Sequence, residues 1–280
     1  MSSRVAVVTD STAYLPAVQA NAAHVTVVPV QVVVGGETFD ETEVSSADIA
    51  DALREWRPIS TSRPSPSAFV EVYERLALEG AEEIVSVHLS GAMSATVESA
   101  ELAAKEVSVP VRVVDSRSIG MGLGFPVLAA AQAAASGADA GRVEQIACDR
   151  SESASVLFYV DTLEYLRRGG RIGKAAALVG SALSVKPLLH LVDGNVTPLE
   201  KVRTTSKALA RMEELAIELV GEGAADVAVQ HLANADRAHA LAARIQERAD
   251  GAVAVTVGEV GAVVGAHVGP GMIAVAVSPR

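Results

Sequence analysis

Hydrophobic and polar residues alternate along the first half of the chain in a pattern that predicts strands followed by helices. Short β-branched runs end in polar or glycine-containing turns, and amphipathic or alanine-rich stretches follow them. Strands are predicted at 4–11, 24–39 (broken at Pro29), 82–91 and 111–116, and helices at 47–56, 94–106 and 125–137. Strands that alternate with helices of about 10–15 residues favour crossover connections and a mostly parallel sheet.

Ligands of such sheets bind beyond the carboxyl ends of the strands. Hydroxyl side chains gather after three of the predicted strands, at 9–12, 89–94 and 115–118. A further segment, 57–69, holds three prolines and five hydroxyl residues, so it cannot be a helix interior or a central strand. It is either a surface linker or an ordered loop that presents hydroxyls to a ligand.

The second half of the chain has a different order of predicted elements. A short helix closed by glycines is predicted at 161–173, and a hairpin at 186–203 turns at Asp193-Gly194. Apolar residues at helical spacing follow within 205–223. We therefore predict an α/β protein with two domains: residues 1–157, with a mostly parallel Rossmann-like sheet and flanking helices, and residues 158–280, a smaller α/β domain with antiparallel pairing.

The composition argues against several classes of function. Half of the residues are hydrophobic, aromatic residues make up 3%, and the net charge is −11, which argues against general nucleic-acid binding. The sequence has no apolar run of about 18 residues and no signal-peptide pattern, so we expect a cytoplasmic protein without an integral membrane segment. Cys148 is the only cysteine and the six histidines form no metal-binding pattern, so we expect no metal site and no cofactor.

Positive charge is concentrated in one window of this acidic chain. Residues 161–207 carry eight Lys or Arg and four Asp or Glu, a local charge of +4, which points to an anionic partner. Arg167 and Arg168 also suit the C-terminal end of a helix, where cations are favourable. Arg171 lies between glycines and Arg203 in a β-like run, so these two are the stronger candidates for binding a carboxylate or phosphate.

Three kinds of chemistry can be weighed from the motifs. The glycines of 120–124 lack the third position of a dinucleotide-binding turn, so a tight turn is the better interpretation. A serine hydrolase has no GxSxG elbow here, although Ser90, His267 and Asp10 could come together in space. An esterase-like hydrolase that uses Ser90 and His267 is therefore kept as an alternative.

Carboxylate binding fits the same residues with fewer assumptions. Ser90 and Gly91 lie at a strand end just before a helix, where backbone N–H groups favour an anion. Thr61, Ser62 and His267 supply further possible donors. Such a site would suit an amphiphile with an apolar tail, and a carrier of another amphiphilic anion remains open.

Seven motifs follow one another along the chain. They are VVTDST (7–12), TSRPS (61–65), LSGAMSA (89–95), VVDSRSIGMGLG (113–124), DTLEYLRRGGRIG (161–173), LSVKPLLHLVDGNVTPLEKVRT (183–204) and AHVGPG (266–271). In these motifs and in their order, the chain resembles the DegV family of bacterial fatty-acid-binding proteins over essentially its whole length.

The resemblance implies a buried long-chain fatty acid between two α/β domains, with its carboxyl group bound at the mouth. The implied carboxylate-binding residues are Thr61, Ser62, Ser90, Gly91 and His267. It also implies that a separate fatty acid kinase phosphorylates the presented carboxyl group to make acyl phosphate for phospholipid synthesis. The chain itself would then be a lipid carrier rather than an enzyme, and nothing in it demands more than a monomer.

The resemblance assigns Arg171 and Arg203 to kinase docking or to the transferred phosphate. Three positions depart from the family pattern: Arg63 replaces a usual Gln, and Ala92 and Val268 each replace a usual Thr. Two hydroxyls are thus missing near the predicted head-group site and one cation is added.

Overall fold

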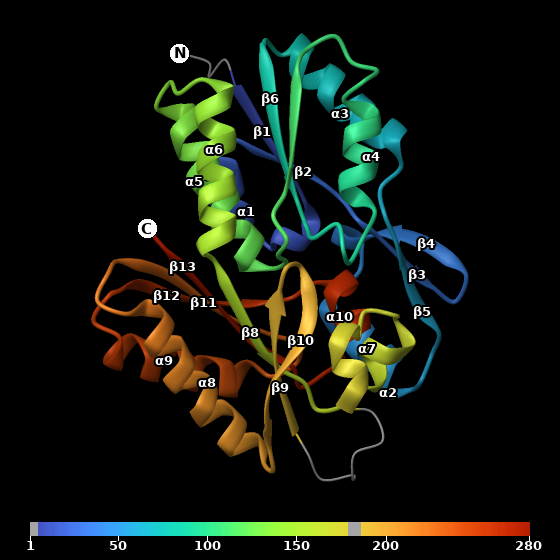
Figure 1. The fold of residues 1–280 in the computed structure, drawn as a ribbon. Helices are drawn as coiled ribbons and strands as arrows, with labels where there is room; N and C mark the ends of the chain where they lie inside the picture. The colour runs from blue at the N-terminus through green and yellow to red at the C-terminus, as the bar shows by residue number, and fades with distance from the viewer. Residues whose placement is uncertain (1–4, 179–185) are drawn as a thin grey trace. The chain divides into compact units, whose positions relative to one another are not determined.

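The computed structural model describes residues 5–178 and 186–280, and the chain divides into two compact units. The first unit joins Met1–Gln31 with Ser62–Ser153, and the second joins Val32–Thr61 with Ala154–Arg280. Both combine strands with covering helices (Figure 1), which confirms the predicted two-domain α/β class. The first three residues of the 183–204 motif lie outside the described residues.

The first unit is built on a parallel sheet with the strand order β2-β1-β6-β7. Its strands are β1 (Val5–Asp10), β2 (Val25–Val28), β6 (Glu83–His88) and β7 (Val111–Asp115). Its helices are η1 (Ser11–Ala13), α1 (Ala17–Ala22), α3 (Pro66–Leu78), α4 (Thr96–Ala103), α5 (Met121–Ala135) and α6 (Ala140–Ser153). The predicted crossover pattern is therefore confirmed.

Both faces of this sheet are buried. Neighbouring residues of a strand point to opposite faces, so the burial of each face can be followed on a single strand. On β1, Val7 packs into a cluster with α5 and α6, and Val8 packs into another with α3 and α4. Figure 1 shows these two helix pairs on opposite sides of the sheet. Continuous apolar strands are the sequence signature of this double coverage.

The second unit contains a mixed six-stranded sheet with the order β10-β9-β8-β13-β11-β12. Its strands are β8 (Ser155–Tyr159), β9 (Lys186–Val192), β10 (Asn195–Val202), β11 (Ala225–His231), β12 (Ala252–Glu259) and β13 (Ile273–Pro279). The β9–β10 hairpin turns at Asp193 and Gly194, whose φ angles of 48° and 74° are those of a type I′ turn, as predicted.

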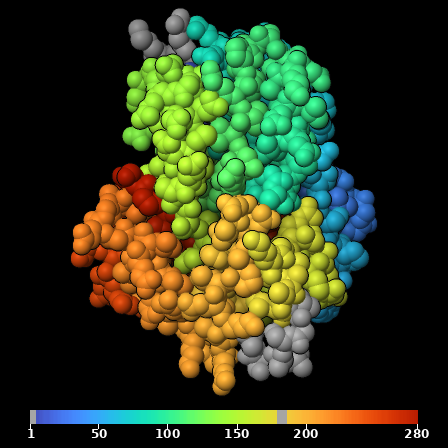
Figure 2. All heavy atoms as spheres, viewed as in Figure 1, coloured from blue at the N-terminus to red at the C-terminus, as the bar shows by residue number. Residues whose placement is uncertain are grey.

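Two long helices, α8 (Thr205–Val220) and α9 (Ala235–Arg248), cover one face of this sheet with apolar side chains. Their outward residues form part of the surface seen in Figure 2, in orange. None of the described helices is long and apolar enough to cross a membrane.

A small three-stranded sheet, β4-β3-β5, completes the second unit. It comprises β3 (Gln31–Val34), β4 (Glu37–Asp40) and β5 (Ile59–Ser62), accompanied by η2 (Glu41–Glu43), α2 (Ser46–Arg54), α7 (Glu164–Arg168), η3 (Gly173–Leu178) and α10 (Ala262–Val268). Apolar residues of β3, α2 and α10 share one cluster around Ile49.

This small sheet changes two expectations. Residues 32–61 were predicted in the first domain, but they group with the second unit because α2 packs against α10, far away in sequence. The segment 57–69 is neither a linker nor a plain loop, since it contains β5 and the start of α3. Its strand lies at the edge of the small sheet, where the nearby prolines are tolerated.

Candidate functional site

A hydrogen bond between Thr61 and His267 forms the centre of the candidate site in the second unit. Thr61 lies on β5, and its Oγ1 is 2.9 Å from Nε2 of His267. His267 lies in the last turn of α10, which ends at Val268 and is capped by Gly269. The structure therefore brings together two of the residues that the resemblance assigned to one carboxylate.

The imidazole of His267 lies against the backbone of Gly169. A methyl group at position 169 would collide with Nδ1 of the ring, so this approach requires glycine. Nδ1 is buried and has no hydrogen-bond partner among the described residues. Burial, and after it the positive charge of Arg171, lowers the pKa of His267 to about 4. The ring is therefore neutral at pH 7.

A neutral ring carries one proton, and its surroundings favour Nε2 as the position. A proton on Nδ1 would leave a buried donor unsatisfied, because this atom has no hydrogen-bond partner among the described residues. With the proton on Nε2, His267 donates to Thr61. The hydroxyl proton of Thr61 is then directed to another acceptor.

A pocket of about 260 Å³ adjoins this pair in the second unit. It is lined by Leu53, Trp56, Arg57, Pro58, Ile59, Tyr165, Arg168, Gly169 and Ala266. Gly169 contacts the His267 ring and Ala266 precedes it in sequence, so one wall of the pocket borders the histidine. The pocket thus combines apolar walls with positive charge next to the Thr61–His267 pair.

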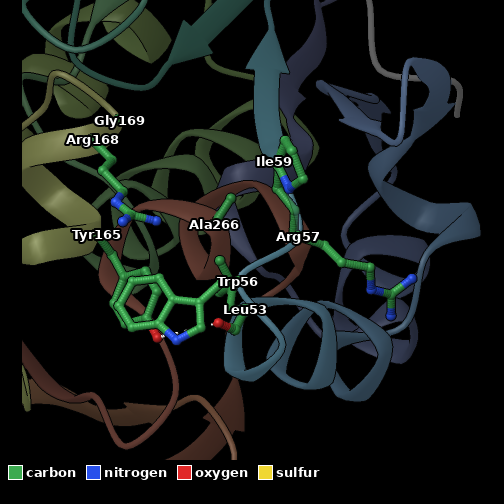
Figure 3. A pocket seen from close by; sticks show the side chains of 9 residues that line it. Leu53, Trp56, Arg57, Ile59, Tyr165, Arg168, Gly169 and Ala266 are labelled. Carbon is green, nitrogen blue, oxygen red and sulfur yellow. Dashed lines mark hydrogen bonds between the residues drawn. The ribbon is translucent and has the colours of Figure 1, made fainter.

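Trp56 and Arg168 form the most distinctive contact of this pocket. Trp56 is 56% exposed and stacks on Tyr165 with ring centroids 6.1 Å apart. The guanidinium of Arg168 lies 4.5 Å from the centre of the Trp56 ring (Figure 3), a cation–π geometry. Arg57 points away from these rings in the same view.

Three cations of the window form ion pairs with acidic residues of the same window: Arg167, Arg168 and Lys186. Arg167 and Arg168 both bind Glu164, and these hydrogen bonds lower the pKa of Glu164 to about 2. Arg171 donates to the carbonyl of Gly169 at 2.6 Å. Arg203 is exposed just beyond β10. The ion pairs of Glu164 with Arg167 and Arg168 thus link residues within α7. The roles of Arg171 and Arg203 stay predictions.

The predicted serine turn lies in the first unit. Ser90 is fully buried after β6, and its Oγ accepts the N–H of Ala92 at 3.2 Å. The expectation that backbone N–H groups there face a ligand is not met in the structure. The N–H of Ser90 donates to Ser118, and that of Gly91 donates to Oδ1 of Asp115.

Asp10, the acid of the hydrolase alternative, is engaged within the first unit. Its carboxylate accepts from His88 at 3.0 Å, and Nε2 of His88 lies 2.7 Å from Ser86. This Ser–His–Asp order resembles a hydrolase triad, but Ser86 is fully buried and its oxygen accepts the proton of Tyr73. No group of three or more His, Cys, Asp or Glu that could hold a metal ion occurs in the described parts of the chain.

Comparisons with known proteins identify the family of the chain. A family model described as "Uncharacterised protein, DegV family" matches residues 4–280. The chain belongs to the DegV family. A DegV domain-containing protein of Streptomyces coelicolor is 53% identical over the full length of both chains. Another from Halalkalibacterium halodurans is 39% identical and covers 96% of each chain.

Solved DegV structures share the fold. A fatty-acid-binding DegV family protein from Thermus thermophilus has a TM-score of 0.94 and 34% identity, covering 99% of this chain and 100% of its own. DegV from Bacillus subtilis, named as a fatty acid binding protein, has a TM-score of 0.90 and 30% identity, covering 99% of both chains. The predicted family is thus confirmed.

Some site features of this DegV protein escaped sequence reasoning. Trp56 and Tyr165 were not singled out, although a lone tryptophan in an aromatic-poor chain was a usable signal. Ser62 and Arg63 are exposed, and Ser62 bonds only weakly to the next carbonyl, at 3.4 Å. Of the two missing hydroxyls, Ala92 lies on an exposed turn and Val268 is buried on α10.

The part-buried His267 should make stability depend on pH. The folded-state pKa of His267 is about 4 and that of an unfolded chain is 6.5, so between these values only the unfolded chain binds the proton. This contribution is complete above pH 6.5 and is lost as the pH falls towards 4. We expect about 2 kcal/mol of the fall in unfolding free energy between pH 7 and pH 5 to come from His267.

Urea unfolding of ligand-free protein at both pH values measures this effect. His267→Gln should flatten the pH dependence by that amount. His239→Gln, at an exposed position of α9, is the matched control and should keep the dependence of the wild type. An equally steep dependence in His267→Gln would contradict the buried neutral ring.

Proposed function

We propose that this protein binds a long-chain fatty acid and that the Thr61 hydroxyl donates a hydrogen bond to its carboxylate. The observation that carries the proposal is the Thr61–His267 pair, in which a neutral, part-buried imidazole directs the threonine proton away from itself. His267 then acts through Thr61. This refines the expectation from sequence, which had the histidine itself donating to the ligand.

The family supports the same ligand class. Relatives of known structure with 34% and 30% identity are named as fatty-acid-binding, and both cover nearly the whole chain. The pocket beside His267 has apolar walls and a cationic rim, which suit an amphiphilic anion. We further propose that the Ser90 hydroxyl and Ser62 contribute to carboxylate binding. Gly91 contributes through its backbone conformation and not through its N–H, because that N–H donates to Asp115.

The second part of the proposal is that the bound carboxylate is presented to a separate fatty acid kinase. The protein would then be a carrier and not an enzyme, and the acyl phosphate would enter phospholipid synthesis. Arg203, exposed beside the start of α8, is suited to contact the kinase or the transferred phosphate, and Arg171 adds positive charge near His267. The hydrolase alternative has no support from the contacts of Asp10 and His267.

Extraction of the purified protein tests the ligand class. We expect denatured protein to release one long-chain fatty acid per chain, detected by mass spectrometry. Reloading ligand-free protein with that acid should raise its melting temperature, because a ligand at 100 times its Kd adds about 2.7 kcal/mol to stability. Absence of any released acid together with absence of a thermal shift on loading would refute the proposal.

Replacement of Thr61 tests the hydrogen bond. Thr61→Val removes the hydroxyl at nearly constant volume, and we expect fatty acid affinity to fall about 10-fold or more, since hydrogen bonds to charged groups are worth about 1.5–3 kcal/mol. Thr256→Val, at an exposed position of β12, is the control and should bind like the wild type. Unchanged affinity in Thr61→Val would show that this hydroxyl is not a ligand group.

Replacement of Arg203 tests the carrier role. Arg203→Ala should retain bound fatty acid but slow phosphorylation of that acid by a purified fatty acid kinase with ATP. Lys201→Ala removes a neighbouring exposed charge of β10 and serves as the control for general electrostatic steering. Loss of the lipid itself in Arg203→Ala would instead place this arginine at the ligand.

A further inference from the structure

A chain of buried hydrogen bonds in the first unit runs from α3 over strand β6 to the end of strand β1. Tyr73 donates to Ser86 at 2.8 Å, Ser86 lies 2.7 Å from Nε2 of His88, and Nδ1 of His88 lies 3.0 Å from Oδ2 of Asp10. All four side chains are fully buried. The rings of Phe69 and His88 meet edge to face, with their centroids 5.1 Å apart.

The direction of this chain follows from its two ends. A carboxylate only accepts, so Nδ1 of His88 carries a proton and donates to Asp10. Tyr73 donates to Ser86, and the proton of Ser86 can then point to Nε2 of His88. Every donor is thus matched by an acceptor, and the chain ends on the carboxylate of Asp10.

Asp10 also accepts hydrogen bonds from two backbone segments, at Thr12 and at Leu89. Its Oδ1 accepts the N–H and the hydroxyl of Thr12, at 3.1 and 2.5 Å, and its Oδ2 also accepts the N–H of Leu89 at 3.0 Å. With the bond from His88, four donors surround one buried carboxylate. A buried carboxylate is tolerated only when it is satisfied in this way, so its position is strictly fixed.

Leu89 is the residue before Ser90, so this carboxylate fixes the start of the serine turn. The next two N–H groups are fixed too, that of Ser90 by Ser118 and that of Gly91 by Asp115. Three successive N–H groups are therefore held by three acceptors from other segments. Among these acceptors, only Asp10 belongs to the neighbouring central strand, β1.

We propose that Asp10, oriented by His88, is a positioning residue for recognition of the ligand carboxylate: it sets the turn that carries Ser90. The inference rests on the proposed function, in which the Ser90 hydroxyl contributes to carboxylate binding. It predicts an effect on the recognition of the head group and not only on the stability of the fold.

The test compares a C16 fatty acid with the C16 alcohol of the same chain length. Both bury the same tail, so the ratio of their affinities reports recognition of the carboxylate alone. Asp10→Asn is nearly isosteric but turns one acceptor into a donor, which faces either Thr12 or Leu89 and displaces that segment. We expect the acid-to-alcohol ratio to fall about tenfold, the equivalent of one lost hydrogen bond to a charged group.

A matched control separates positioning from general destabilisation. Glu213 is also a buried carboxylate, held by Arg244 and Arg248 in the second unit. Glu213→Gln should lower the melting temperature and leave the acid-to-alcohol ratio unchanged. Ser90→Ala should lower the ratio like Asp10→Asn, and the double variant should show little further loss, because both act on one contact.

Two histidine variants keep the test decisive if Asp10→Asn does not fold. His88→Asn retains a donor near the position of Nδ1, so it can still bind Asp10, and should preserve the ratio. His88→Gln places its amide near Nε2 and loses the bond to Asp10, so it should lower the ratio. The reverse order of these two variants would overturn the inference.

The failure of the inference and that of the proposed function give different results. If the wild type binds acid and alcohol equally well, carboxylate recognition itself is refuted, and the inference with it. If the wild type prefers the acid and Thr61→Val or Ser90→Ala lowers that preference, but Asp10→Asn retains it, only the positioning role of Asp10 is refuted.

Discussion

The hydrogen bond between Thr61 and His267 joins residues 206 positions apart, and the second unit is organised so that it can form. One partner lies on the edge strand of the small sheet and the other on a short helix near the end of the chain. Two contacts fix the start of that helix against the earlier segment. The buried carboxylate of Glu41 accepts the N–H of Val263, and the hydroxyl of Ser46 donates to the carbonyl of Val260. Segment 32–61 therefore belongs with the C-terminal half of the chain.

Sequence reasoning succeeded where structure is decided locally. The turn at Asp193-Gly194 follows from two residues that accept positive φ angles, and the parallel sheet follows from apolar strands spaced by helices. It missed the assignment of segment 32–61, because the packing of Ile49 against Ala262 joins positions that no local pattern links. For the same reason no helix was predicted around His267, since a short helix with an internal glycine is stabilised by tertiary contacts more than by propensity.

The candidate site shows a similar division. Motif order identified Thr61 and His267, but the pairing of Asp10 with His88 depends on two neighbouring strands and could not be found from either segment alone. Charge counting found the cationic window but not its pairing. Glu164 binds both Arg167 and Arg168, and the latter also covers the ring of Trp56. These charges therefore contribute to a local structure in which an exposed tryptophan is held in place.

His88 and His267 share one physical role. His88 directs a proton to Asp10, and His267 directs one to Thr61, so each ring orients an oxygen atom. A carboxylate that is bound by hydroxyl donors is located without a strong bidentate ion pair to an arginine. Its oxygen atoms then keep more of their nucleophilic character than they would in such an ion pair. This balance matters for the proposed carrier role, because a ligand fixed by a buried arginine would be both less reactive in phosphoryl transfer and slower to leave.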